Sequence, residues 1–181
     1  MSNYNRPHQP DSKLFFMVRL LDRNSNLLVR EVERLRAATR QTLQTLPFEI
    51  DEIVVLPAVI HTIWTLPTGD TDFSKRWRML KSHFSRGLPA PEDWGGPTLK
   101  HREKGIWQRR FWEHHLRDDE DLAAHRHMIL TAPVQAGLVA RPEQWAHSSI
   151  HRAIRLGQFD PKQKVGTIYA PTLCHPLLKT G

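Results

Sequence analysis

A histidine in a short apolar segment is the first residue that could support metal chemistry. His61 lies in the run VIHTIW at 59–64, which is typical of a buried strand. Because side chains alternate across a strand, Val59 and His61 share one face. A His-hydrophobe-His triplet would aim two imidazoles at one metal ion, whereas this face offers a single imidazole. We therefore interpret His61 as a partly buried histidine that is satisfied by hydrogen bonds.

A pair of histidines, His125 and His127, lies in a predicted helix. Residues two apart on a helix do not face each other, so this spacing is not a metal motif. Met128 follows the pair and is most simply explained by core packing.

Aromatic and basic residues are interleaved in the segment GIWQRRFWEHH at 105–115. Rings stack on bases and guanidinium groups hold phosphates, so this segment is a candidate for binding nucleic acid. The alternative is an edge strand whose rings pack inward while its arginines are solvated, and the sequence leaves both open. A basic helix face, formed by Lys75, Arg76, Arg78 and Lys81, adds Lys81 to the candidates, although a face that is merely solvated has the same composition. The candidate DNA-binding residues are Lys81, Trp107, Gln108, Arg109 and Arg110.

Composition limits the classes of partner and site. The chain has 181 residues, and 26 lysines and arginines against 19 acids give a net charge of +7. Such a charge favours polyanionic partners, nucleic acid first. No apolar run is long enough for a membrane span, and the first residues lack the apolar core of a signal peptide, so we expect a cytoplasmic protein without a membrane partner. Cys174 is the only cysteine, which excludes an intrachain disulfide and a cysteine-based zinc site. Phosphate-binding loops, dinucleotide turns and nucleophile elbows are also absent from the sequence.

The elements that would position these residues predict an α+β fold. Hydrophobic periodicity predicts strands at 14–21, 48–56 and 59–66, a fourth near 106–112, and helices at 26–46, 72–85, 118–130 and 148–156. The order strand, helix, strand, strand, helix, strand is that of a ferredoxin-like sandwich, an antiparallel sheet with helices packed on one face. Additional helices follow at the C-terminus. We expect a flexible arm at 1–12, one domain at 13–156, a long loop at 87–105 and a tail at 157–181.

The stretch from Phe15 to about Arg155 resembles the REP-associated tyrosine transposases, a branch of the HUH single-strand nucleases. The segments that carry the resemblance are LFFMV at 14–18, VVLP at 54–57 leading into HTIWTLP at 61–67, FSKRW at 73–77 with Lys81, GIWQRRFWEH at 105–114, PV at 133–134, GLV at 137–139, and Trp145 with SS at 148–149. The resemblance agrees with the ferredoxin-like fold that the periodicity predicts.

The resemblance implies a chemistry and a substrate. Family members bind hairpin-forming repeats as single-stranded DNA and place a divalent metal, usually magnesium, on a His-hydrophobe-His pair. The metal polarises the scissile phosphate. A tyrosine on a helix then attacks and forms a 5′-phosphotyrosine bond.

This chain departs from the family pattern at the positions that carry that chemistry. Val59 stands where the first metal ligand belongs, so His61 is a lone remnant of the pair. Met128 stands where the nucleophilic tyrosine belongs, and Ala136 replaces the histidine that usually follows. Neither Tyr4 nor Tyr169 substitutes easily, since both lie outside the matched region. No catalytic residue is therefore intact, and we expect no cofactor here, with magnesium or manganese only in active relatives.

Three hypotheses remain open at this point. The first is a transposase-family protein that binds single-stranded or hairpin DNA and has lost strand cleavage. The second is an active metal-dependent nuclease with a rearranged site, for example His61 with His114, His125 or Glu113 and water as the nucleophile. The third is a structural scaffold with no DNA role, whose basicity is only ancestral. A homodimer is possible in each case, and nothing in the sequence specifies its interface.

Overall fold

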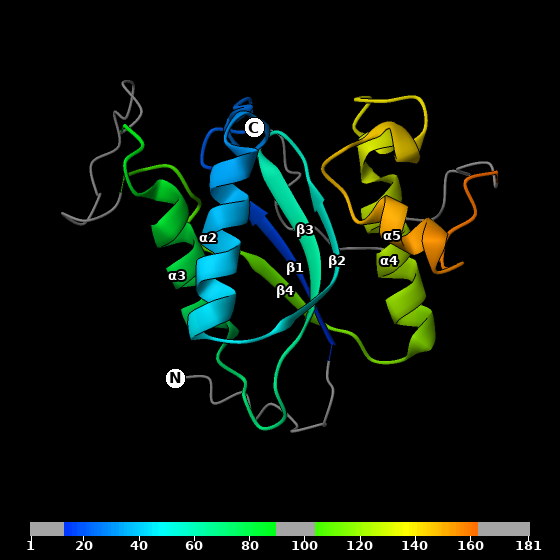
Figure 1. The fold of residues 1–181 in the computed structure, drawn as a ribbon, viewed down its shortest axis with the longest axis horizontal. Coiled ribbons are helices and arrows are strands. Elements are labelled where there is room, and N and C mark those ends of the chain that lie inside the picture. Colours follow the sequence, from blue (N-terminus) through cyan, green and yellow to red (C-terminus); the bar gives the residue numbers. More distant parts are fainter. Residues whose placement is uncertain (1–12, 90–103, 163–181) are drawn as a thin grey trace, which may run out of the picture.

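Four antiparallel strands form the centre of the molecule. The computed structural model describes residues 13–89 and 104–162. The strands β1 (Lys13–Arg19), β2 (Glu49–Val55), β3 (Val59–Thr65) and β4 (Trp112–His115) form one sheet in the order β2-β3-β1-β4 (Figure 1). This order is that of a ferredoxin-like sandwich, so the predicted fold class is confirmed.

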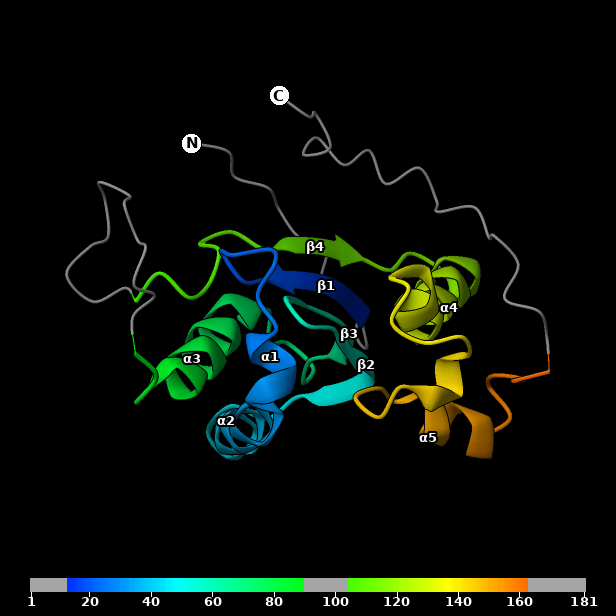
Figure 2. The same ribbon diagram turned by 90° about the horizontal axis from the view of Figure 1, so that it is seen from above.

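Helices lie on both sides of this sheet. On one side lie α1 (Leu27–Arg30), α2 (Val32–Thr45) and α3 (Phe73–Ser85), while α4 (Asp119–Gln135) lies on the other (Figure 2). The short 3-10 helix η1 (Pro142–Gln144) and α5 (Ile150–Arg155) follow on the side of α4. None of the helices in 13–89 and 104–162 combines the length and apolarity needed to cross a bilayer.

Alternation along β1 builds a separate core on each face of the sheet. Leu14, Phe16 and Val18 belong to the larger core, under α2 and α3, whereas Phe15 and Met17 belong to a smaller one under α4. Aromatic rings fill the larger core, where the indoles of Trp64 and Trp77 stack with centroids 4.3 Å apart. The sheet therefore lies between two cores.

The fourth strand lies later in the chain than the sequence pattern predicts. Residues 106–111 carry only an isolated bridge between Leu20 and Trp107, and β4 begins at Trp112. A continuous strand would place Arg109 on the same face as Trp107 and Phe111, which pack against the larger core. The bend around residue 109 instead leaves Arg109 exposed.

Helix α4 is longer than predicted, because Pro133 does not end it. The helix runs to Gln135, with Pro133 buried inside it. It ends in a Schellman motif at Gly137, which has a φ of 68°. In this motif Leu138 N donates to Pro133 O, and Gly137 N donates to Val134 O, both at 2.9 Å.

The structure describes only part of the predicted arm, loop and tail. The arm at 1–12, most of the loop at 87–105 and residues 163–181 of the tail lie outside the described residues. At the start of the predicted tail, Phe159 packs against the small cluster of Leu130, Ile150 and Ala153. The boundaries themselves stay a prediction.

Candidate functional site

The two positions that should carry the family's chemistry lie in an apolar environment. Val59 begins β3 and Met128 lies on α4, and both pack against the core under α4. That core consists of Phe15, Met17, Val54, Leu56, Ile63, Ile129 and Ala132. A thioether and a branched alkyl group in such a cluster cannot serve as a nucleophile or as ligands for a hard cation.

His61 lies on the same face of β3 as Val59. Its ring meets that of Phe15 edge-on, with centroids 6.0 Å apart. The expected alternation of Val59 and His61 is thus confirmed, and the neighbour of His61 on that face is packed into hydrocarbon. These residues do not fit the divalent metal of the family pattern, because one imidazole would be the only ligand of the motif.

The structure brings together three other polar side chains, from β4 and α4. His114 Nε2 donates to Asp121 Oδ2 at 2.8 Å, and His125 Nδ1 lies 3.0 Å from Asp121 Oδ1. The two imidazoles are nearly parallel, with centroids 4.9 Å apart. His125 Nδ1 also donates to the backbone carbonyl of Asp121 at 2.8 Å. We call these residues, His114, Asp121 and His125, the His–Asp–His cluster.

Burial and hydrogen bonding set the charge of this cluster. Burial raises the pKa of the Asp121 carboxyl, but hydrogen bonds from His114 and Arg117 outweigh it and hold that pKa below its ordinary value. Burial lowers the pKa of His125, and the carbonyl and carboxylate of Asp121 offset this only in part. His125 is therefore neutral at pH 7 beside an ionised Asp121.

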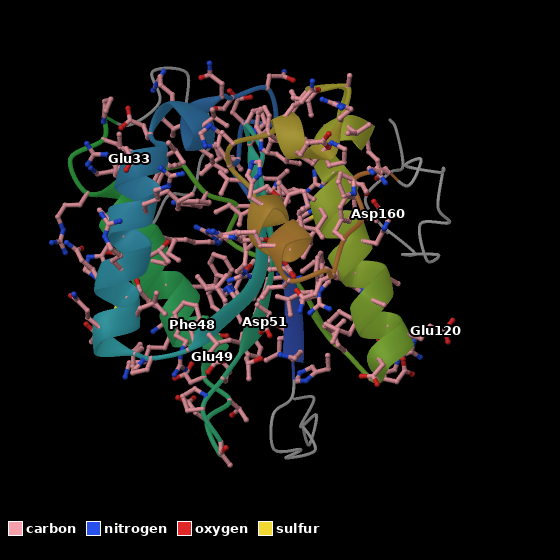
Figure 3. All side chains as sticks on the ribbon, turned by 45° about the vertical axis from the view of Figure 1, so that its right-hand side comes forward. Glu33, Phe48, Glu49, Asp51, Glu120 and Asp160 are labelled. Atoms are coloured by element: carbon pink, nitrogen blue, oxygen red, sulfur yellow. The ribbon has the colours of Figure 1, made fainter. Side chains whose placement is uncertain are left out.

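Local geometry explains why Asp121 is the member that the sequence analysis missed. Asp118 caps α4 by accepting a hydrogen bond from Asp121 N at 2.8 Å. Asp119 and Glu120 are exposed, and Glu120 points away from the sheet at the start of the helix (Figure 3). Asp121 instead faces His125, four residues later on the same side of the helix. That i,i+4 spacing was the available signal, but a run of four acids at a helix start also suits the helix dipole.

The histidines proposed for a rearranged site are only partly brought together. His114 and His125 do meet, as that hypothesis expects. His61 does not join them in this cluster, since Phe15 packs against both His61 and His125, at 6.0 and 4.9 Å between centroids. His127 is not in the cluster either, and its ring lies 6.0 Å from that of Phe159. The expectation that His125 and His127 point apart is confirmed.

A second polar cluster fixes α4 and the following segment to β2. Glu52 is 1% exposed, and its Oε1 accepts from Arg126 Nε at 3.0 Å. Ser149 Oγ donates to Oε2 at 2.5 Å, and Arg152 Nη2 lies 3.8 Å from the same oxygen. The carboxylate thus joins three elements, and its charge is compensated within the fold.

The segment between 106 and 111 is attached to the sheet and to α3. Gln108 N donates to Arg19 O at 3.0 Å, and Gln108 O accepts from Lys81 Nζ at 3.0 Å. The half-buried Trp107 donates through Nε1 to Ser85 Oγ at 3.1 Å. Arg109 and Arg110 lie exposed at the bend between these anchors.

Lys81, a DNA-binding candidate, lies among aromatic rings. Its ammonium is 5.7 Å from the ring centroid of Trp107 and 5.5 Å from that of Phe111. Burial lowers the pKa of Lys81 to about 8. Its contact with Gln108 O makes it a support for the segment, and its role toward DNA stays a prediction. On the same helix, Arg76 is buried and donates to Pro47 O at 2.8 Å, so this part of the expected basic face is not solvated.

An open cavity of about 410 Å³ separates α2 from the segment at 146–152. Arg36, Arg40 and Arg152 contribute to its lining, so it has a basic character. Arg36 is paired with Glu33 at 2.5 Å, and Arg152 donates to Ile50 O at 3.2 Å. Most of this positive charge is already engaged within the protein.

Comparison with known proteins identifies relatives of this chain. No protein-family model matches the chain. A REP-associated tyrosine transposase of Haemophilus influenzae is 40% identical over 156 residues, which cover 86% of this chain and 89% of that protein. One of Escherichia coli strain K12 is 38% identical over 159 residues, 88% of each. A solved structure described as a REP-associated tyrosine transposase bound to a REP hairpin superposes with a TM-score of 0.74 at 38% identity, covering 88% of this chain and 89% of that one.

Proposed function

Because this chain belongs to the REP-associated tyrosine transposase family, we propose that it binds hairpin DNA without cutting it by the family's tyrosine route. A relative with the same fold over 88% of this chain is bound to a REP hairpin, which supports the binding half of the proposal. The net charge of +7 provides the electrostatic attraction that such binding needs. The location consistent with this role is the cytoplasm.

One observation carries the other half, the absence of tyrosine-route cleavage. Met128 and Val59 both pack against the apolar core under α4. Forming a 5′-phosphotyrosine bond requires a phenol oxygen at position 128, and a thioether has no proton to lose and no oxygen to attack phosphorus. With Val59 beside His61, the cation that would polarise the phosphate also lacks its paired ligand.

The proposed DNA contacts centre on the bend between 106 and 111. Arg109 and Arg110 are exposed there and are suited to backbone phosphates. Trp107 and Gln108 hold the bend in place from one side, and Lys81 supports it through Gln108 O. This arrangement favours phosphate contacts by the two guanidinium groups over base-stacking on Trp107, whose ring centroid lies 5.2 Å from that of Phe84.

The His–Asp–His cluster is not proposed as a replacement active site. The Asp121 and His125 side chains are 8% and 2% exposed, so a DNA phosphate cannot reach an ion held by all three residues. The observed burial thus favours a binding protein over a nuclease with water as its nucleophile.

The test uses one fluorescent hairpin oligonucleotide with a single-stranded flank. The protein is titrated at two salt concentrations, with and without manganese, and the products are separated on a denaturing gel. We expect binding that weakens steeply with salt and neither a cut strand nor a covalent band. Binding that is absent or does not weaken with salt would favour the scaffold hypothesis, whereas a cut strand or covalent band would refute the loss of cleavage.

A pair of charge variants tests where the DNA lies. The variant R109Q/R110Q should bind at least about tenfold more weakly and lower the salt slope by about 1–2, because two phosphate contacts are lost. Arg155→Gln, on the exposed side of α5, is the control and should leave the slope within about 0.5 of the original. Equal effects of the two variants would contradict the proposed location.

A further inference from the structure

The His–Asp–His cluster has the donor atoms of a metal site. One ligand atom from each of His114, Asp121 and His125 lies within 4.8 Å of the other two. We propose that these three side chains bind one zinc-like divalent ion, which ties β4 to the start of α4. This site is separate from the His-hydrophobe-His position, and the proposal does not depend on DNA binding.

The distances within the cluster suit a shared ion. His114 Nε2 lies 2.8 Å from Asp121 Oδ2, and the His125 ring lies nearly parallel to the His114 ring, with centroids 4.9 Å apart. Two ligand atoms that each bond zinc at about 2.0–2.1 Å are separated by about 3.3 Å in tetrahedral geometry, so His114 and Asp121 need only a small side-chain adjustment to share the ion. His125 would bond the ion through Nε2, because its Nδ1 donates to the backbone carbonyl of Asp121.

The chemistry of the donors selects the class of metal. Two imidazoles and one carboxylate are a usual ligand set for zinc, with water at the fourth position. Magnesium prefers an octahedron of oxygens and is poorly served by imidazole nitrogen. The cluster should therefore bind zinc and discriminate strongly against magnesium.

The bonding of His125 within the protein is incomplete. Both hydrogen-bonding contacts of its Nδ1 go to Asp121, one to the carboxylate and one to the backbone carbonyl. Its Nε2 is buried and has no hydrogen-bond partner among residues 13–89 and 104–162. An imidazole whose opposite nitrogen donates to a backbone carbonyl is the form that metal sites commonly use. The incomplete bonding is an observation independent of the cluster's spacing.

Burial determines how the ion would enter and what it would do. His114 is 28% exposed, while Asp121 and His125 are nearly enclosed, so entry is from the His114 side. Arg117 Nε donates to Asp121 Oδ2 at 3.2 Å from a side chain that is 76% exposed, and it can shift without cost to packing. An ion enclosed in this way would stabilise the fold and is not placed to contact DNA.

The experiment measures metal binding by the full chain after treatment with a chelator. Zinc and, separately, magnesium are titrated by calorimetry, and the unfolding temperature is recorded with each metal. We expect one zinc ion per chain with a dissociation constant in the micromolar range or tighter, a rise in unfolding temperature, and no response to magnesium. Cobalt should add the visible absorption bands of a tetrahedral nitrogen–oxygen site.

Matched histidine variants separate this site from weak surface binding. His114→Gln removes the most exposed ligand and should weaken zinc binding at least about tenfold while the protein still folds. His151→Gln, at an exposed position of α5, should leave zinc binding unchanged. Failure to bind one zinc ion, or equal affinities of the two variants and the original chain, would overturn the proposal.

Discussion

The two faces of the sheet are joined to their helices by different kinds of interaction. Under α2 and α3, stacked and edge-on rings such as Trp64 and Trp77 fill the core. Under α4, a smaller apolar core lies with two polar clusters, which are centred on Glu52 and Asp121. The first face depends on buried area, whereas the second also depends on charge and on complete hydrogen bonding.

This difference explains how a member of this family can carry valine at position 59 and methionine at position 128 and keep its fold. Val59 and Met128 lie at the edge of the smaller core and are only partly buried. Substitution there leaves the aromatic face untouched. We therefore expect stability to come mainly from the aromatic face and from the two polar clusters, and the following predictions test that ranking.

The largest loss of stability should come from the aromatic face. Trp77 is 1% exposed and stacks on Trp64. Trp77→Ala should lower the free energy of unfolding by about 4 kcal/mol, equally at pH 5 and pH 8, because no ionisable group is removed. Urea denaturation measures this. Arg78→Ala, at an exposed position of the same helix, should change it by less than about 0.5 kcal/mol. A loss below about 2 kcal/mol for Trp77→Ala would reverse the ranking of the two faces.

The Glu52 cluster should be the next most sensitive region. Glu52→Gln removes the charge that compensates Arg126 and one acceptor of the Ser149 hydroxyl, in a position that is 1% exposed. We expect a loss of about 3 kcal/mol in urea denaturation, because the half-buried guanidinium of Arg126 loses the carboxylate that balances its charge. Glu49, at the exposed start of the same strand (Figure 3), provides the control Glu49→Gln with a change below about 0.5 kcal/mol. Similar effects of the two variants would mean that the cluster contributes nothing beyond a surface pair.

The Asp121 cluster should add a smaller contribution that disappears in acid. The folded pKa of Asp121 lies below its unfolded value, so its ionisation stabilises the fold above about pH 4 and ceases to do so as the pH falls through the folded pKa. Asp121→Asn should cost about 2 kcal/mol at pH 7 in the presence of a chelator, and less at pH 3. Asp119→Asn is the exposed control on the same helix turn. A difference in unfolding free energy between the original chain and Asp121→Asn that does not change with pH would show that hydrogen-bond geometry, and not charge, stabilises the fold here.

The partly buried ammonium of Lys81 should destabilise the aromatic face of the sheet at neutral pH. Its folded pKa of about 8 lies below the unfolded value, so the unfolded chain binds more protons between pH 8 and about 10.4. The free energy of unfolding should therefore rise with pH across that window, by about 1–2 kcal/mol more than in Lys81→Met. Lys75→Met, at an exposed position of the same helix, should keep the rise. Parallel pH profiles of the original chain and Lys81→Met would refute a desolvated ammonium at this position.

Local periodicity was enough to predict most of the fold. The two-residue alternation of β1 and β3 and the apolar stripe of α3 are strong signals, and they located these elements to within two residues. The single helix predicted at 26–46 is instead divided into α1 and α2, which are interrupted at Glu31. The fourth strand was predicted too early in the chain, because interleaved rings and arginines have the pattern of a strand. A continuous strand would, however, place Arg109 on the face that packs against the larger core. The helix predicted at 118–130 stops short of Pro133, whereas α4 continues through it, and the Schellman motif that ends α4 depends on Gly137 and Leu138, beyond the proline.

The site was predictable only where residue type alone decides. Val59 and Met128 carry neither an imidazole nor a phenol whatever their surroundings, so residue type alone is the basis of the prediction at these two positions. The His–Asp–His cluster depends on pairing between β4 and β1, which sets His114 opposite Phe15 and beside α4. A register between strands that are about 100 residues apart cannot be read from local patterns. Lys81 could not be ranked either, since its burial is decided by rings that follow it by more than 25 residues.

The smallest effect on stability should come from Met128, the position on which the proposed loss of cleavage depends. Met128 packs against the core under α4 but is only partly buried, so the longer tyrosine side chain can place its hydroxyl toward solvent. Met128→Tyr should change the free energy of unfolding by less than about 1 kcal/mol, whereas Ile129→Ala, at a fully buried neighbour, should cost about 2–5 kcal/mol. The new phenol should still form no covalent band with the hairpin oligonucleotide in manganese, because Val59 leaves the cation without its paired ligand. A covalent band from this single variant would show that position 128 alone limits cleavage, and that the apolar edge of the smaller core is closer to a working site than its side chains indicate.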